Sequence, residues 1–107
     1  MDNDDIQDLF QSVGPVTIKR MFGGKGIYLD GMIIAIHLRD ELMLKGDKEA
    51  GPLYEEAGSH QWTYTHNKSK KPVSMPYWPI PSEAFDDSDE AAKWVRVAVE
   101  AARRSGK

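Results

Sequence analysis

The dipeptide Asp30-Gly31 constrains the fold of this chain more than any other feature, because it separates two alternating apolar stretches. Aspartate and glycine tolerate the positive φ angles of a type I′ turn, so two residues are enough to reverse the chain. Arg39-Asp40 is a second, weaker turn of the same length. Connections this short indicate an antiparallel meander, since parallel strands need long crossovers. The alternating apolar residues predict four strands, over residues 16–22, 26–30, 32–39 and 41–46.

The third of these strands, MIIAIHLR, is apolar on both of its faces. Strict alternation places four apolar residues on one face and two on the other: Met32, Ile34, Ile36 and Leu38, then Ile33 and Ala35. This pattern predicts a central strand with both faces at least partly covered. We expect His37, in the same strand, to be packed and hydrogen-bonded rather than a ligand or a base.

Three helices are predicted around these strands. An apolar stripe at i, i+3, i+4 and i+7 predicts a helix over residues 3–13, which Gly14-Pro15 ends. A short helix is expected to start near Pro52, which suits a first helical turn, and to end at Gly58. The long C-terminal helix starts at Asp87 with a D-x-x-E pattern. Six apolar residues share one of its faces: Ala91, Trp94, Val95, Ala98, Ala101 and Ala102.

The region between the short and the long helix holds the weakest signals. QWTYTHN predicts a strand over residues 61–67, residues 73–75 predict a short edge strand, and the prolines that follow indicate an extended connector. The order of elements is typical of one α+β domain over residues 1–107. It has two layers: an antiparallel β-meander sheet, and an N-terminal, a short middle and a long C-terminal helix packed on it.

The composition excludes several classes of protein. The chain has 107 residues and no cysteine, which excludes disulfides and thiolate metal sites and is typical of a reducing cytoplasm. Its acidic N-terminus is unlike a secretory signal, and no apolar run approaches the ~20 residues of a membrane helix. We therefore expect a cytoplasmic protein without membrane contact. A formal net charge of −3 argues against strong non-specific binding to nucleic acid.

The stretch RMFGGKGIYLDG, residues 20–31, looks like a phosphate-binding loop but fails both common templates. A Walker loop needs Ser or Thr after its lysine, whereas Gly26 follows Lys25. The dinucleotide pattern G-x-G-x-x-G has Leu29 at its third glycine, and both templates need a helix where a strand is predicted. We expect a hairpin turn over Gly23 to Gly26. A small anionic ligand held there by Arg20 is the alternative.

No residues form a recognised catalytic or metal-binding motif. His37, His60 and His66 lack metal-ligand spacing, and the acidic block at residues 83–90 lacks the alternating pattern of a calcium loop. We predict no catalytic residue, metal or cofactor.

A second alternative concerns nucleic acid. Lys68, Lys70 and Lys71 lie between the aromatic residues Trp62, Tyr64, Tyr77 and Trp78, and the C-terminal tail carries Arg103 and Arg104. Bases could stack on the rings while the lysines hold phosphates. The competing interpretation is that Trp62 and Tyr64 belong to the core and that the lysines form the tip of a hairpin.

The whole chain resembles the TfoX (Sxy) N-terminal domain family of bacterial competence regulators. The resemblance rests on GPVTIKRMFGGKGIYLDG, LMLKGD, WTYTHNKSKKPVSMPYW and DDSDEAAKWVRVAVEAA. It implies a two-layer α+β fold, similar to the secretion-chaperone-like folds, in a short stand-alone member that lacks the second, helical domain of the longer regulators. The family has no settled catalytic residues, so only its signature carries over to this chain: Arg20, Met21, Phe22, Gly23, Gly24, Gly26, Tyr28, Tyr77 and Trp78.

The resemblance also implies a function. It points to a non-enzymatic regulatory domain that acts through protein partners, namely the transcription machinery or other regulators, with a homodimer as one form. Direct, weak binding of nucleic acid and binding of a small anion beside Arg20 are the two alternatives.

Overall fold

A computed structural model describes residues 1–21, 23–65 and 67–106 of the chain. It confirms the α+β fold with a five-stranded antiparallel sheet in the order β1-β2-β3-β4-β7. The strands are β1 Thr17–Met21, β2 Gly24–Leu29, β3 Met32–Leu38, β4 Glu41–Lys45 and β7 Tyr77–Pro79. Both predicted two-residue turns are confirmed, because φ is positive at Asp30 (51°), Gly31 (82°), Arg39 (51°) and Asp40 (63°).

The glycine-rich turn is shorter than the sequence predicted. The predicted turn over Gly23 to Gly26 is wrong for its last three residues, because β2 already begins at Gly24. Met21 pairs with Gly24 and Arg20 with Lys25, so only two residues connect β1 to β2. The prediction failed because glycine was taken to end a strand. Here Gly24 and Gly26 lie within the strand, at positions where neighbouring groups leave no room for a side chain.

The alternation predicted for β3 is also wrong. Ile27 pairs with Ala35 and Tyr28 with Ile33, so Ile34 is the extra residue of a β-bulge. The bulge shifts the face of every residue after it. Ile34 and Ala35 therefore both belong to the main core, whereas Ile33 and Ile36 lie on the other face of the sheet. A bulge depends on how two strands pair, which one strand's periodicity does not reveal.

The first helix ends earlier than predicted. Helix α1 spans Asn3–Leu9, and residues 11–13 form a separate 3₁₀ turn instead of continuing it. A capping box holds its start, where the Asp5 amide donates to the Asp2 side chain over 2.9 Å. The tighter turn leaves Phe10 fully buried in the core. It also lets the Gln7 side chain bond both backbone groups of Val16, at 2.7 and 3.1 Å, which fixes the entry into β1.

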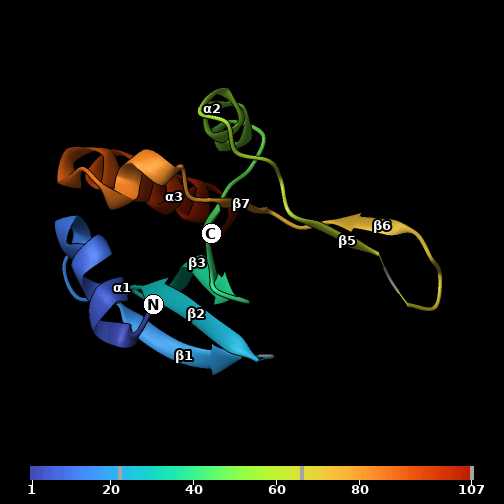
Figure 1. Cartoon of the computed structure of the whole chain (residues 1–107), viewed down its shortest axis with the longest axis horizontal. Helices are drawn as coiled ribbons and strands as arrows, with labels where there is room; N and C mark the ends of the chain where they lie inside the picture. The colour runs from blue at the N-terminus through green and yellow to red at the C-terminus, as the bar shows by residue number, and fades with distance from the viewer. Residues whose placement is uncertain (22, 66, 107) are drawn as a thin grey trace.

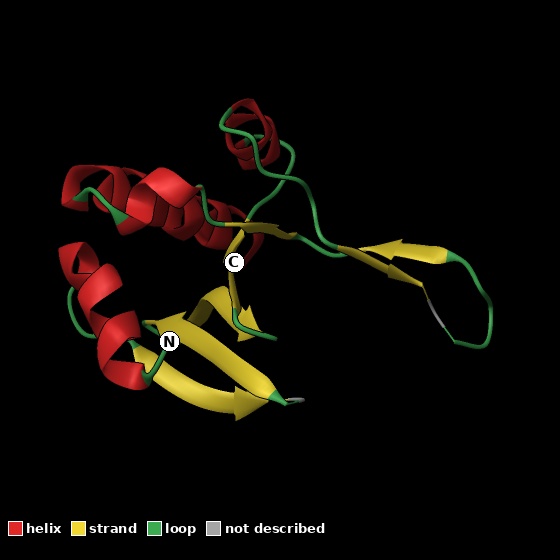
Figure 2. Cartoon of the chain, in the orientation of Figure 1, coloured by secondary structure: helices red, strands yellow, loops and turns green. Residues whose placement is uncertain are grey.

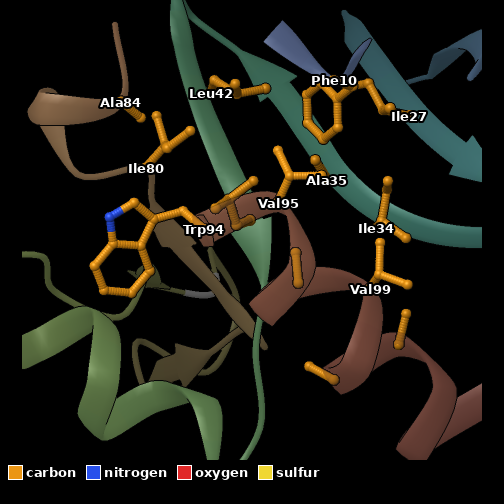
Figure 3. Packing of buried hydrophobic residues seen from close by; sticks show 14 of the residues in the cluster. Phe10, Ile27, Ile34, Ala35, Leu42, Ile80, Ala84, Trp94, Val95 and Val99 are labelled. Carbon is orange, nitrogen blue, oxygen red and sulfur yellow. The ribbon is translucent and has the colours of Figure 1, made fainter. Parts of the chain in front are cut away.

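Helices α1 and α3 cover one face of the sheet (Figures 1 and 2). Helix α3 spans Ser88–Gly106 and starts as predicted after Asp87, whose carboxylate accepts from the Asp89 amide at 2.8 Å. All six residues of its predicted apolar stripe are buried. Figure 3 shows Val95 and Val99 beside Ala35 and Ile34 of the sheet, Trp94 beside Ile80, and Phe10 beside Ile27, all in one cluster. This layer is the main hydrophobic core.

Helix α2 spans Ala50–Glu56, two residues ahead of the predicted start at Pro52. Asp47 explains the difference, because its carboxylate accepts from the amides of Glu49 and Ala50 at 3.0 and 2.8 Å. Arg104 of α3 donates to the same carboxylate at 2.7 Å and ties the start of α2 to the end of α3.

The proline-containing region agrees only in part with its prediction, because the short strand expected over residues 73–75 is present one residue earlier. Strands β5 Thr63–Thr65 and β6 Pro72–Ser74 form a separate two-stranded sheet, which is shorter than the predicted strand over residues 61–67. We call β5, β6 and the turn between them the arm, because it extends away from the body (Figure 1). His66 lies outside the described residues. The segment predicted as a connector instead contains β7, which pairs with β4 at the edge of the main sheet.

Candidate functional site

One face of the main sheet carries a second, smaller apolar cluster. Ile36, Met43 and Tyr77 are buried in it, and Met21, Ile33, Leu38, Trp62 and Met75 pack against it partly exposed. We call this surface the open face, because the helices that contact the sheet in the described part of the chain pack on the other side. Burial raises the pKa of Tyr77, so its phenol stays neutral there.

A groove of about 790 Å³ runs along the open face to the base of the arm. Met21, Met43 and Met75 line it together with Trp62 and Tyr64 of the arm region. Methionine side chains adapt to irregular partners and are over-used at binding surfaces. Tyr64 is 42% exposed, and its ring lies 5.8 Å from that of Trp62. The groove therefore combines adaptable apolar walls with an exposed aromatic side chain.

A second hollow lies beside the glycine-rich turn. It has a volume of about 610 Å³ and is lined by Met1, Arg20, Met21, Gly23, Gly24, Lys25, His37, Arg39 and Asp40. We call it the cationic pocket. The pocket contains three basic side chains and the α-amino group of Met1 but one carboxylate, although the net charge of the whole chain is −3. The sequence had suggested Arg20 as an anion partner, and the structure places that residue in this pocket.

His37 is buried as predicted, with 8% of its surface exposed. The prediction that it is hydrogen-bonded fails for one ring nitrogen, because Nε2 has no partner among the described residues. Burial lowers the pKa of His37, and the α-amino group of Met1 and Lys25 lower it further, while Asp40 acts in the opposite direction.

The signature residues divide between the two faces of the sheet. Met21 and Tyr77 line the groove, and a Cβ atom on Gly26 would meet the side chains of Met21 and Tyr28. Gly23 lines both the groove and the cationic pocket, whereas Gly24 lines only the pocket. Phe22 lies outside the described residues.

Trp78 is a signature residue on the helix-covered side of the sheet. It is buried in the main core, where its indole Nε1 donates to Glu55 of α2 at 3.0 Å. A Cβ atom at Gly46 or Gly51 would collide with its ring. Trp78 therefore holds α2 against the sheet, and its role is structural.

The residues proposed to contact nucleic acid do not form one surface. Lys68, Lys70 and Lys71 are exposed at the turn of the arm, as the hairpin-tip interpretation predicted. Tyr64 is exposed rather than part of the core, while Tyr77 and Trp78 are buried and offer no stacking face.

The two arginines of the C-terminal tail lie on α3 instead of the arm. Arg104 is paired with Asp47 and Glu49, at 2.7 Å to each, and Arg103 lies in the last turn of the same helix. Their charges therefore serve the helix end and the junction with α2.

The family comparison supports the resemblance seen in the sequence. The profile of the TfoX N-terminal domain matches residues 8–102. The chain belongs to the TfoX N-terminal domain family. Among curated proteins, none gives a significant match to it. The matched range contains every strand, the last two residues of α1 and most of α3, so it includes the groove and every residue of the cationic pocket except Met1.

Sequence reasoning missed several residues that line these two hollows. Lys25, His37 and Arg39 were not grouped with Arg20, although two-residue turns on either side of β2 and β3 fix their pairing. Met43, Trp62 and Met75 gave no signal for a shared surface, because they come from three distant segments.

Two further observations concern the described part of the TfoX domain. None of its helices is long and apolar enough to cross a bilayer. Its His, Asp and Glu side chains do not gather in threes at metal-binding distances within residues 1–21, 23–65 and 67–106.

Proposed function

We propose that this TfoX domain is a non-enzymatic regulatory module that acts by binding protein partners, and that its first partner is a second copy of itself. The observation that carries the proposal is the apolar groove on the open face, walled by three methionines and by the aromatic side chains at the arm. Membership in the family supports a role like that of the competence regulators, in transcription and together with other regulators.

The arm supports a second copy as the occupant of the groove. Its strands have three residues each, and an isolated two-stranded hairpin is marginally stable in water. Contact with another protein surface would hold it in place. The stretch between Glu56 and Glu83 has three lysines and no acid, whereas the whole chain has a net charge of −3. The arm of one copy is therefore attracted to the acidic body of another.

Sedimentation over a wide range of protein concentration tests this proposal. We expect a reversible dimer, and we expect Tyr64→Glu to raise its dissociation constant at least about tenfold, since exposed tyrosines are frequent hot spots. Phe85→Glu is the matched control, because Phe85 is 53% exposed and lies outside the groove. A parent chain that stays monomeric at high concentration would contradict the proposal, and so would equal weakening by the two variants.

Nucleic acid is the second candidate partner, because three lysines and the exposed Tyr64 lie together on the arm. Replacement of Lys68, Lys70 and Lys71 by alanine would then weaken binding and lower its dependence on salt concentration. Affinity purification with and without nuclease separates the two candidates, since only nucleic-acid-mediated association disappears after digestion. Unchanged affinity of the triple variant would exclude the arm as the contact.

A further inference from the structure

The sheet register sets Arg20, Lys25 and His37 side by side on three adjacent strands. Arg20 of β1 pairs with Lys25 of β2, and Lys25 pairs with His37 of β3. Directly paired residues of antiparallel strands point to the same face, with Cβ atoms about 5 Å apart. Like charges in such positions destabilise a sheet. The register thus places two positive charges and an imidazole next to one another on one face of the sheet.

His37 provides an independent sign of a missing partner. Its Nε2 atom is buried and has no hydrogen-bond partner among the described residues, although its side chain lines the cationic pocket. A buried polar atom left without a partner costs about 1–3 kcal/mol, so such atoms are few and a bound ion or ligand is one explanation for them. An acceptor in the pocket would satisfy the imidazole N–H.

The other charged groups around His37 favour an anion. Lys25 and Arg20 come from the neighbouring strands, Arg39 and Asp40 from the turn after β3, and the α-amino group of Met1 from the start of the chain. Lys25 Nζ already donates to Asn3 at 2.7 Å, which fixes the side chain at the pocket.

We propose that the cationic pocket binds the phosphate group of a small phosphorylated molecule. Arg20 presents a planar guanidinium that matches phosphate oxygens, Lys25 adds a point charge, and Nε2 of His37 donates to a third oxygen. A volume of about 610 Å³ is within the range of small-ligand pockets and leaves room for an organic part. The exposed acidic residues Asp2, Asp4 and Asp5 at the start of α1 would repel a long polyanion such as nucleic acid, which favours a small ligand.

The imidazole resonances of His37 give a direct test by NMR on the full chain. We would titrate the protein at pH 7 with glycerol 3-phosphate, inorganic phosphate and glycerol, and assign His37 through His37→Gln. We expect saturable shifts with both phosphates, none with glycerol, and a rise in the pKa of His37 when the dianion binds, because a negative charge beside the imidazole favours its protonated form. This readout reports on the ligand alone and does not depend on whether the chain dimerises.

Two variants and a control locate the site. Arg20→Gln and Lys25→Gln should each lower the affinity for glycerol 3-phosphate at least about tenfold, as expected for the loss of a charge-assisted hydrogen bond. Lys19→Gln should leave the affinity unchanged, because Lys19 neighbours Arg20 in β1 but lies over the Tyr28 ring, 5.0 Å from its centroid, on the open face.

Three results would overturn the proposal: no shift of His37 at millimolar phosphate, binding of inorganic phosphate without glycerol 3-phosphate, or equal weakening by Lys19→Gln and Arg20→Gln. Even if His37→Gln fails to fold, the Arg20 and Lys25 variants decide the question, because neither side chain is buried.

Discussion

Replacement of Gly24 by alanine tests why the turn region is rich in glycine. A Cβ atom at Gly24 would collide with the backbone oxygen of His37 and with a methyl group of Leu38. The side chain of Leu38 can rotate away, but the carbonyl oxygen belongs to the strand that pairs with β2 and can move only if that pairing opens. Gly24→Ala should therefore cost stability through a steric collision between two strands.

The size of this effect follows from the rigidity of the colliding atom. Overpacking costs typically about 1–3 kcal/mol, and a backbone collision places Gly24→Ala near the upper end, about 3 kcal/mol. With an m value of about 1.5 kcal/mol/M, the urea midpoint should fall by about 2 M. The melting temperature should fall by about 12 °C for a chain of this size.

Gly31 provides the matched control for this experiment. It has a positive φ of 82°, and a Cβ atom there would meet nothing within 4 Å. Gly31→Ala should cost about 1 kcal/mol through its backbone conformation, and Gly31→Asn should recover much of that loss because asparagine tolerates this region. Gly24→Asn should recover nothing. The steric explanation is refuted if the free energy of unfolding of Gly24→Ala lies within about 0.5 kcal/mol of the parent's, because ordinary surface substitutions have effects of that size.

Three further changes have defined outcomes. Burial lowers the pKa of His37 below 6.5, so the unfolded chain binds a proton at this residue before the folded chain does as the pH falls. The free energy of unfolding should therefore decline below pH 6.5, and His37→Gln should reduce that decline in urea titrations at a series of pH values. The Arg104 hydrogen bond lowers the pKa of Asp47 from 3.8 to about 2, so its stabilisation is present above pH 3.8 and lost as the pH falls toward 2. Asp47→Ala should cost about 1–2 kcal/mol in urea titrations at pH 7, mostly from the lost cap, since the Arg104 side chain is 39% exposed and the ion pair is screened. Trp78→Phe should cost about 2 kcal/mol through the hydrogen bond to Glu55 and the lost ring volume, and a melting temperature unchanged within 2 °C would contradict a structural role for Trp78.

Features set by residues close together in the sequence were predicted correctly, whereas features set by contacts between distant residues were not. The turns at Asp30-Gly31 and Arg39-Asp40 and the buried stripe of α3 were predicted correctly, because backbone preference and side-chain period act within a few residues. The start of α2 was misplaced by two residues, since a cap from Asp47 and an arginine of α3 set it. Strand β7 was missed because it exists only through its pairing with β4.

The candidate sites show the same division. Arg20 and the glycines were identified from the sequence, but their neighbours were not, because His37 joins Arg20 and Lys25 only through the register of three strands. The groove brings together Met43 with residues of the arm region that lie about twenty or more positions later in the chain.

The amino-acid sequence by itself determined the family, the α+β class and the turns at Asp30-Gly31 and Arg39-Asp40, since these depend on local patterns and on short motifs such as RMFGG. The tertiary structure alone decided which face each side chain of β3 occupies, because a single inserted residue at Ile34 reverses the alternation. It also decided that Gly24 and Gly26 lie in strand β2 rather than in the turn before it. The adjoining cationic pocket arises from side chains that strand pairing, and no linear motif, brings together.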